Sequence, residues 1–352
     1  MTDKTIKPVI IGASGYTGGD FIRLAHGHPN SEITALVAHT HAGKPVTDVF
    51  PHLMAQDLPP MVKSDEVNWS EVDAAICGLP HGTAQDLIAT IPGHVKIIDM
   101  SADFRLRDIK DYEAWYGRAH DHPELYNEVA YGLPEHNRDA IKNARIIACP
   151  GCYPTAVLLG LLPLIKQDLI NTETIILDAK SGVSGAGRSP KQNTLFCEAG
   201  EGLSPYAIGN HRHTPEIEQE LNAAAKDVAN NDIKVTFTPH LVPMSRGELI
   251  TGYLSLKPGK TIEDARAAFE ASYKEEPFIH LAPTGQTPAT QQVRGSNHCV
   301  IGLFEGRASN QLIVISTIDN LVKGSAGQAM QNFNIVFGLP ETTGLEQMPL
   351  FP

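Results

Sequence analysis

Two cysteines near the middle of the chain have the residue type and the spacing for chemistry. They lie in residues 147–156, IACPGCYPTA, where Cys149 and Cys152 are separated by a proline and a glycine. The same spacing occurs in redox dithiols and in zinc sites, and a single cysteine thiolate is also a nucleophile. These possibilities imply different proteins, so the rest of the sequence must distinguish them.

The redox and metal interpretations fit the chain poorly. A thioredoxin-like motif opens a helix in a small domain, whereas this one lies deep in a chain of 352 residues. A zinc site would add His211 and His213, whose H-x-H spacing differs from that of zinc fingers. We therefore expect no bound metal.

The nucleophile interpretation fits the local pattern. Residues 144–148 predict a buried strand, so Cys149 at its end is expected to be a buried structural thiol. Cys152 precedes an apolar helical pattern with Pro154 in its first turn. A helix N-terminus favours negative charge, so we expect the pKa of Cys152 to lie below the ~8.5 of a free cysteine. Cys152 is the predicted nucleophile; an inert cysteine at the helix start is the alternative.

A glycine-rich turn near the N-terminus predicts a dinucleotide site. Residues 6–12 indicate a buried strand, and a helical pattern follows the turn GASGYTG and ends at Pro29. This arrangement points a helix N-terminus at a pyrophosphate. The spacing is GxxGxxG rather than GxGxxG, so a turn kept for tight packing is the alternative. The predicted cofactor contacts are Gly12, Ser14, Gly15, Tyr16, Thr17 and Gly18.

The segment after the second predicted strand, 32–38, favours NADP(H) over NAD(H). An acidic residue at this point would bind the ribose 2′-hydroxyl of NAD and would repel a 2′-phosphate. The sequence instead continues His39-Thr-His-Ala-Gly-Lys44, without a carboxylate and without an arginine. The 2′-phosphate would then be neutralised by His39, Thr40, His41 or Lys44.

The first half of the chain predicts a parallel sheet. Strand patterns at 72–79, 95–100 and 144–148 alternate with helical segments, and ligands gather at the carboxyl ends of such strands. LPHG and SADFR follow two of them. The predicted cofactor contacts on these loops are Pro80, His81, Gly82 and Ser101.

The second half predicts a different sheet. Strand patterns at 174–180, 233–238, 247–256, 298–304 and 311–317 are interrupted by one clear helix, 261–275, which indicates a mixed or antiparallel sheet. The expected fold class is therefore α/β, with a Rossmann-like parallel-sheet domain followed by an α+β domain. A loop rich in glycine and serine, 181–188, ends in Arg188 and could hold phosphate or carboxylate; a flexible surface loop is the alternative.

Composition excludes several classes of protein. The net charge is −12 and the basic residues are scattered singly rather than clustered, so a nucleic-acid partner is not expected. No stretch resembles a signal peptide or a membrane span, so we expect a cytoplasmic protein without a membrane partner.

A dinucleotide and a thiolate together indicate the reduction of an acyl group. Attack of the thiolate on an activated acyl group gives a thioester, and hydride from the nicotinamide reduces the thioester to an aldehyde. A histidine would serve as the general acid/base.

Seven motifs in order along the chain resemble the N-acetyl-γ-glutamyl-phosphate reductases of the semialdehyde dehydrogenase group. They are GASGYTG at 12–18, LPHG at 79–82, SADFRL at 101–106, PGCYPTA at 150–156, SGVSGAGR at 181–188, HRHTPEI at 211–217 and DNLVKG at 319–324. The resemblance implies NADPH-dependent reduction of an acyl phosphate, a small-molecule substrate, to a semialdehyde in arginine biosynthesis. It also implies a homo-oligomer, a dimer or tetramer. The implied domains are 1–152 for NADP, completed by a C-terminal helix at about 319–352, and 153–318 for catalysis and dimerisation.

The resemblance also assigns roles to single residues. Cys152 would be acylated, and His211 would be the general acid/base with His213 beside it for substrate. These two roles could be exchanged, because residues two apart on an extended segment face opposite ways; one of the two could instead cap the following helix. Asn320 would bind the nicotinamide carboxamide or serve as the N-cap of the last helix.

Five more residues are implied to bind the substrate. A forked guanidinium matches phosphate or carboxylate, so Arg105, Arg188 and Arg212 are candidates for its two anionic ends, although each could be a surface arginine. Ser181 and Tyr206 would line the pocket with hydroxyl groups.

Three rival functions remain open from the sequence. The HRHTPEI segment argues against an aspartate-semialdehyde dehydrogenase. A reductase of the one-carbon-longer N-acetyl-aminoadipyl phosphate is harder to exclude, because one methylene in a pocket is worth only ~1–3 kcal/mol. A non-catalytic dinucleotide-binding regulator would need neither Cys152 nor His211.

Overall fold

The computed structural model describes residues 5–225 and 232–352, and the chain divides into two compact units. The first unit comprises residues 1–151 and 325–347, and the second comprises 152–324 and 348–352. The last segment was expected to join the first domain from about residue 319. In the structure residues 325–347 belong to the first unit, whereas 348–352 return to the second, where the Leu350 N–H donates to the Arg294 carbonyl over 2.8 Å.

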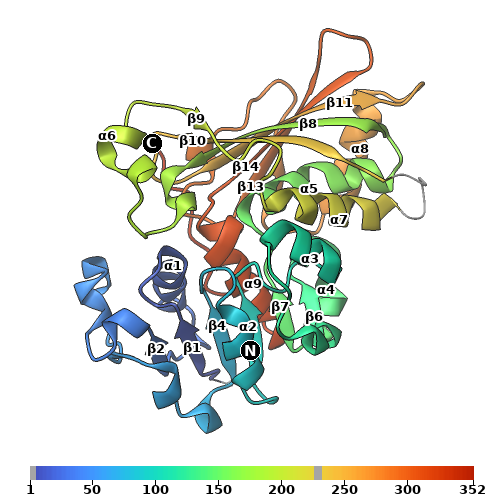
Figure 1. Cartoon of the computed structure of the whole chain (residues 1–352). Helices are drawn as coiled ribbons and strands as arrows, with labels where there is room; N and C mark the ends of the chain where they lie inside the picture. Colours follow the sequence, from blue (N-terminus) through green and yellow to red (C-terminus); the bar gives the residue numbers. More distant parts are fainter. Residues whose placement is uncertain (1–4, 226–231) are drawn as a thin grey trace. The chain divides into compact units, whose positions relative to one another are not determined.

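The first unit is built on a parallel sheet of seven strands in the order β3-β2-β1-β4-β5-β7-β6 (Figure 1). Its strands are β1 (Pro8–Ile11), β2 (Ala35–Val37), β3 (Met61–Val62), β4 (Ala74–Cys77), β5 (Lys96–Asp99), β6 (Val129–Tyr131) and β7 (Ile146–Ala148). Its helices are α1 (Tyr16–Ala25), α2 (Ala84–Thr90), α3 (Ile109–Tyr116), α4 (Pro134–Asn143) and α9 (Gly327–Val336). The predicted Rossmann-like parallel sheet is therefore confirmed.

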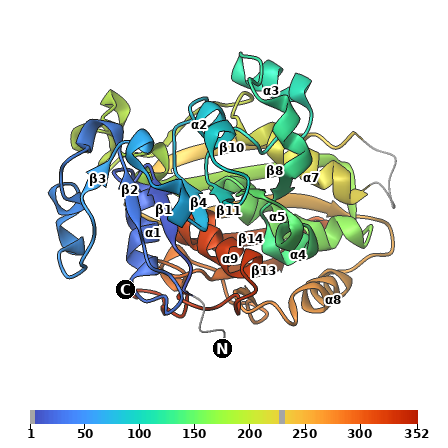
Figure 2. The ribbon, with the colours of Figure 1, turned by 90° about the horizontal axis from the view of Figure 1, so that it is seen from below.

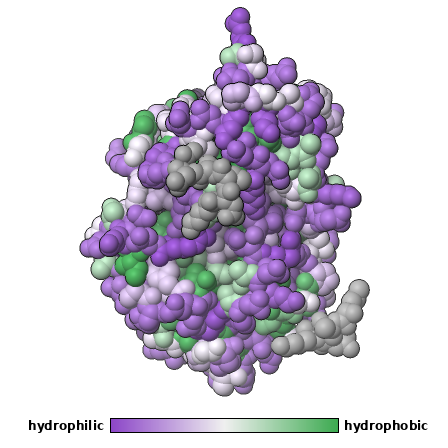
Figure 3. All heavy atoms as spheres, turned by 90° about the vertical axis from the view of Figure 1, so that its right-hand side faces the viewer, coloured by the Kyte–Doolittle hydropathy of each residue, from purple (hydrophilic) through white to green (hydrophobic). Residues whose placement is uncertain are grey.

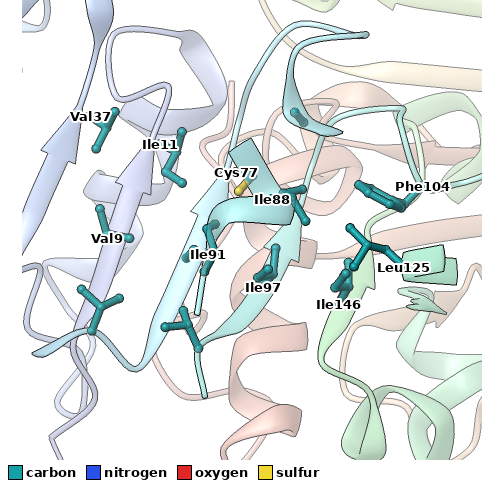
Figure 4. Close-up of a cluster of buried hydrophobic side chains, with 14 of the residues drawn as sticks. Val9, Ile11, Val37, Cys77, Ile88, Ile91, Ile97, Phe104, Leu125 and Ile146 are labelled. Atoms are coloured by element: carbon teal, nitrogen blue, oxygen red, sulfur yellow. The ribbon is translucent and has the colours of Figure 1, made fainter. Parts of the chain in front are cut away.

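Helices cover both faces of this sheet, because successive strand residues point to opposite sides. On one face Ile146 of β7 belongs to the same apolar cluster as Ile88 of α2, together with Ile97 and Phe104 (Figure 4). The next residue, Ile147, packs on the other face with α4 and α9. In Figure 2, α9 is the red helix; it contacts α1, α4 and β5 although it comes more than 170 residues later in the chain.

The second unit is built on a mixed sheet in the order β12-β13-β14-β11-β8-β10-β9, which also confirms the prediction. Its strands are β8 (Ile170–Gly182), β9 (Ser204–Pro205), β10 (Val235–Val242), β11 (Glu248–Leu256), β12 (Ile279–Leu281), β13 (Cys299–Glu305) and β14 (Gln311–Ile318). Its helices are α5 (Cys152–Lys166), α6 (Phe196–Ala199), α7 (His213–Ala225) and α8 (Ile262–Tyr273), and a π-helical turn, Val322–Ala326, leads into α9.

One face of the second sheet is covered and the other is open. Helix α5 lies against this sheet, where it contacts β8, β11 and β14 as well as α7 and α8 (Figure 1). Its apolar residues are buried on all sides. On the opposite face Ile176 and Tyr253 remain 40% and 37% exposed. The molecular face in Figure 3 is mainly hydrophilic, with small scattered apolar patches.

Candidate active site and cofactor site

The glycine turn lies where the strand order of the parallel sheet reverses, between β1 and β4. Gly12 follows β1 with a φ of +83°, and a Cβ placed on it would lie 2.4 Å from the Gly78 carbonyl oxygen. A Cβ on Gly18 would lie 2.4 Å from the Gly12 oxygen. Tight packing therefore requires these glycines, and it also brings the start of α1 to the switch point at which such sheets bind dinucleotides. The remaining predicted contacts, Ser14 to Thr17, occupy the same turn and the start of α1.

Two loops at the same sheet edge are held together by Asp103. The Nδ1 atom of His81 lies 2.8 Å from the Asp103 carboxylate, which also accepts hydrogen bonds from the Gly82 and Ala84 N–H groups. Burial alone would raise the pKa of Asp103, but these donors hold it below its ordinary value. Asp103 was not predicted as a functional residue, although it lies within the SADFR motif.

Ser101 and Arg105 are engaged by their own unit. The Ser101 hydroxyl donates to Asp99 over 2.8 Å and accepts from the Asp103 N–H. The buried Arg105 donates to the Cys149 and Met100 carbonyls over 2.8 and 3.0 Å. These contacts fix the shape of the loops, and the substrate-binding role of Arg105 stays a prediction.

The segment after β2 carries the predicted groups for a 2′-phosphate. His39, Thr40 and His41 form a short 3-10 helix, and Lys44 follows shortly after it. His39, Thr40 and Lys44 are exposed, and His41 is half-buried. The carboxyl end of β2 therefore presents polar and basic side chains to solvent, as a site for an anion requires.

The two cysteines of the central motif have different environments. Cys149 is fully buried after β7, where Asn332 donates to its sulfur over 3.5 Å, and burial raises the pKa of its thiol to about 12. The prediction that Cys149 is a buried thiol is confirmed. Cys152 is half-buried and is the first residue of α5, as predicted. A Cβ on Gly324 would lie 2.8 Å from the Cys152 Cβ, so the turn before α9 passes close to this cysteine.

The two histidines lie side by side rather than facing opposite ways, so that prediction is wrong. His213 is the first residue of α7, not part of an extended segment, and the ring centroids of His211 and His213 are 4.8 Å apart. The His213 N–H donates to Nδ1 of His211 over 3.1 Å, the contact of a residue that caps a helix. Burial, aided by the nearby Arg212, lowers the pKa of His211 to about 4. His211 is therefore neutral near pH 7, with its proton on Nε2.

Aromatic side chains tie these histidines to the helix that begins with Cys152. The ring of Tyr153 lies 5.7 and 5.9 Å from His211 and His213, and Phe237 lies 5.4 Å from His211. The Tyr206 hydroxyl donates to the Tyr153 hydroxyl over 3.2 Å. Burial raises the pKa of both phenols, and the charge of Cys152 acts in the same direction. Tyr206, His211 and His213 therefore gather around the start of α5.

The end of β8 and its glycine loop meet the segment after β14. Ser181 is buried, and its hydroxyl donates to the Gly182 carbonyl over 3.2 Å. The Asn320 amide accepts from the Gly247 N–H and donates to the Ser184 hydroxyl, both over 2.9 Å. Asn320 is not the N-cap of the last helix, because Asp319 accepts from the Leu321 and Val322 N–H groups instead. Its role toward the nicotinamide stays a prediction.

Arg188 and Arg212, the other two predicted anion ligands, are exposed residues of the second unit. The sequence did not single out Glu248, the first residue of β11, whose buried carboxyl interacts with the Cys152 side chain. Within residues 5–225 and 232–352, no group of three or more His, Cys, Asp and Glu side chains is arranged to hold a metal ion. No helix in the described ranges is both long and apolar enough to cross a bilayer.

Comparisons with known proteins agree with this arrangement. Residues 7–144 match the family model of the semialdehyde dehydrogenase NAD binding domain, and residues 152–320 match that of the semialdehyde dehydrogenase dimerisation domain. A relative from Arabidopsis thaliana, named as a probable chloroplastic N-acetyl-gamma-glutamyl-phosphate reductase, is 50% identical over 99% of this chain and 86% of its own length. The N-acetyl-gamma-glutamyl-phosphate reductase of Rhodospirillum rubrum is 47% identical over 99% of both chains.

Solved structures with a similar fold include two aspartate semialdehyde dehydrogenases. The enzyme II from Vibrio cholerae has a TM-score of 0.71 at 18% identity and covers 95% of this chain and 99% of its own. The enzyme from Candida albicans, solved with NADP, has a TM-score of 0.70 at 18% identity with the same coverage. At this identity the likeness establishes the fold only.

Proposed function

Because the chain belongs to the N-acetyl-γ-glutamyl-phosphate reductase family of semialdehyde dehydrogenases, we propose that it reduces N-acetyl-γ-glutamyl phosphate to N-acetyl-L-glutamate 5-semialdehyde with NADPH, in arginine biosynthesis. The observation that carries the proposal is the position of Cys152 at the start of α5, with the paired histidines and two tyrosines of the same unit around it.

Cys152 is the proposed nucleophile. Its sulfur attacks the acyl carbon, a C–S bond forms, and the bond from carbon to the phosphate oxygen breaks, which releases phosphate and leaves a thioester. Bound NADPH supplies a hydride for the reduction of that thioester. The resulting thiohemiacetal loses its hydroxyl proton, the C–S bond breaks, and the semialdehyde leaves with the thiolate restored.

We propose His213, rather than His211, as the group that moves the proton of the thiohemiacetal oxygen. Nδ1 of His211 accepts the His213 N–H, and burial lowers the pKa of the His211 ring to about 4, so the ring is neutral near pH 7. A general acid must carry a proton at the working pH, and a ring with so low a pKa does not. His211 is better suited to holding the start of α7 and offering Nε2–H as a neutral donor. This exchanges the roles expected from the sequence.

The proposed substrate and cofactor ligands follow the sequence-based assignment. Arg188 and Arg212, which are exposed, and Arg105 are each proposed as ligands for an anionic group of the substrate. Tyr206 and Ser181 are proposed to line the pocket. The crowded glycine turn and the start of α1 suit a pyrophosphate, and His39, Thr40, His41 and Lys44 suit a 2′-phosphate.

We also propose that the protein assembles as a homodimer or homotetramer. The match to a dimerisation domain and the partly apolar open face of the second sheet, with Ile176 and Tyr253, support this. Light scattering behind size exclusion would distinguish the two sizes, and a monomer at micromolar concentration would contradict both. A cytoplasmic location stays a prediction, since the relatives from Arabidopsis thaliana and rice are named as chloroplastic.

The test of the proposed function is oxidation of NADPH, followed by its absorbance, with N-acetyl-γ-glutamyl phosphate as substrate. We expect turnover with the wild-type protein and with Cys149→Ala, and none with Cys152→Ser. The one-carbon-longer acyl phosphate and NADH are run in parallel to define specificity. Tight NADPH binding without turnover of either acyl phosphate would contradict the proposal and favour a regulator.

A further inference from the structure

Asp103 is a buried carboxylate to which the reaction described above gives no role. Its side chain has no exposed surface. Its Oδ1 atom accepts the Gly82 N–H over 2.7 Å and lies 2.8 Å from Nδ1 of His81. Its Oδ2 atom accepts the Ala84 N–H over 3.1 Å. A buried carboxylate is costly unless its neighbours satisfy it, so these contacts fix the conformation of the loop after β4.

The imidazole of His81 is held on a second side by aromatic rings. Tyr116 of α3 lies against its face, with ring centroids 4.1 Å apart and an interplanar angle of 32°. Tyr112 of the same helix stacks on Tyr116 at 4.7 Å. The His81 side chain is nevertheless 18% exposed, so part of the ring is accessible to a ligand. Because Nδ1 lies next to a carboxylate, which can only accept, Nε2 is the ring nitrogen left for that ligand.

The loop that carries His81 begins against the glycine turn. The Gly78 N–H donates to the Ile11 carbonyl over 2.8 Å, and a Cβ on Gly12 would lie 2.4 Å from the Gly78 carbonyl oxygen. A Cβ on Gly78 would in turn lie 2.8 Å from the hydroxyl oxygen of Thr17. The loop after β4 and the proposed pyrophosphate site therefore border each other at one edge of the sheet.

The order of the strands sets the direction of a bound dinucleotide. Strands β2, β1 and β4 are neighbours in this order; the segment proposed for the 2′-phosphate follows β2, and the glycine turn follows β1. The adenosine half of NADPH would thus lie on the β2 side of the pyrophosphate, and the nicotinamide half would continue toward β4. The nicotinamide ribose is the first group after the pyrophosphate on that side. Its hydroxyls both donate and accept hydrogen bonds, so they suit an imidazole nitrogen on the loop after β4.

We propose that Nε2 of His81 binds a hydroxyl of the nicotinamide ribose, and that Asp103 is the positioning residue that holds the imidazole in this orientation. The proposal deepens the cofactor site of the proposed function and depends on that function only in that NADPH is the cofactor. The acyl substrate has no part in it, so the proposal is tested by binding alone.

Two ligands distinguish a ribose contact from general damage to the fold. NADPH contains the nicotinamide ribose, whereas adenosine 2′,5′-bisphosphate carries the 2′-phosphate and lacks that ribose. The affinities of both are measured by isothermal titration calorimetry without acyl substrate. We expect His81→Ala and Asp103→Asn each to weaken NADPH binding about tenfold, the usual loss of a hydrogen bond, and to change the affinity for the bisphosphate by less than about twofold.

A double-mutant cycle tests whether Asp103 acts through His81. Asp103→Asn should cost less than about twofold in NADPH affinity when it is added to His81→Ala, because the group that it positions is then absent. Asp73→Asn is the matched control, since Asp73 accepts the Lys7 N–H over 2.9 Å at the opposite, amino end of β4. It should bind both ligands like wild type. Circular dichroism establishes that each variant is folded.

Two results would overturn the proposal. One is a His81→Ala variant that binds NADPH like wild type, or that loses affinity for both ligands equally. The other is an Asp103→Asn substitution that still costs about tenfold in the His81→Ala background. Failure of the proposed function has a different signature: the wild-type protein would bind NADPH without turning over the acyl phosphate, while the NADPH affinities of the variants would still differ.

Discussion

The main-chain N–H of His213 donates to the ring nitrogen Nδ1 of His211 over 3.1 Å. This contact fixes the tautomer of His211 and joins the two rings at the start of α7. It also gives the two histidines, which look equivalent in the sequence HRH, different chemical properties. His211 is neutral and caps the helix, whereas His213 is the first residue of α7.

Substitution by asparagine should lower kcat by different factors at the two histidines and so distinguish their roles. His213→Asn should lower kcat by about 10²–10⁴-fold, the usual contribution of a general acid/base. An asparagine oxygen at position 211 can still accept the His213 N–H, so His211→Asn should cost less than about tenfold. Steady-state kinetics from pH 5 to 9 measure both. If His211→Asn lost the larger factor, the assignment of the proton to His213 would have to be reversed.

Differences in burial should make the cysteines react unequally. With iodoacetamide at pH 8 we expect modification of half-buried Cys152 and exposed Cys197, but not of the buried thiols Cys77, Cys149 and Cys299. Burial raises the pKa of Cys149 to about 12, so its thiolate is scarce at this pH. Peptide mass spectrometry identifies the sites, and Cys197→Ser isolates the reaction of Cys152. Rapid labelling of Cys149 in the folded protein would show that its loop opens.

The architecture of the chain could be read from its sequence because the strongest patterns are local. The strand–turn–helix at residues 6–29 and the run before Cys149 each satisfy their own backbone and apolar requirements, and both formed as predicted. The strands that were missed, β3, β6, β9 and β12, are only two or three residues long. So short a strand is defined by its pairing with a neighbouring strand. That pairing depends on the tertiary structure, which the local sequence does not show.

The site was predictable in its residue types but less so in its contacts. His213 was expected on an extended segment, yet α7 already begins there, with Pro215 in the first turn. Asp103 and Glu248 were missed because a carboxylate in a sequence gives no sign of whether water or protein surrounds it. Asp319 rather than Asn320 accepts the N–H groups of Leu321 and Val322 at the start of the turn before α9. Aspartate and asparagine are both common capping residues, so the sequence could not show which of the two neighbours has this role.

Substitution of two glycines that have nearly the same φ should distinguish the effect of steric crowding from the effect of backbone strain. Gly12 and Gly43 have φ values of +83° and +82°, but a Cβ on Gly12 would lie 2.4 Å from Gly78, whereas a Cβ on Gly43 would have no neighbour within 4 Å. Gly43→Ala should cost about 1 kcal/mol of stability and leave NADPH affinity intact. Gly12→Ala should cost more and weaken NADPH binding at least tenfold. Thermal melting and fluorescence titration measure the two effects, and equal losses in both variants would exclude close packing as the reason for Gly12.

The polar segment after β2 should control the preference between the two cofactors. Lys44→Glu places a negative charge beside the proposed 2′-phosphate, so it should raise the KM for NADPH about tenfold and change that for NADH by less than twofold. His39→Ala should act in the same direction more weakly. Lys63→Glu, a charge reversal next to β3 outside this segment, is the control. Equal effects on both cofactors would place the 2′-phosphate elsewhere.

Stability should depend on pH through Glu248. Its pKa is raised from the ordinary glutamate value of 4.5 to about 8 in the folded protein, so between these values the unfolded chain loses a proton that the folded protein keeps. Unfolding therefore becomes easier as pH rises through this window, with the full penalty above about pH 8. Each tenfold difference in proton affinity is worth about 1.4 kcal/mol, and relaxation of the site reduces the total to about 2–4 kcal/mol. Glu248→Gln removes the penalty, so its melting temperature should exceed that of wild type at pH 8.5 by several degrees more than at pH 5. Glu220→Gln, measured at the same protein concentration, should show no such dependence; a constant difference across the range for Glu248→Gln would mean that Glu248 is already ionised at pH 5.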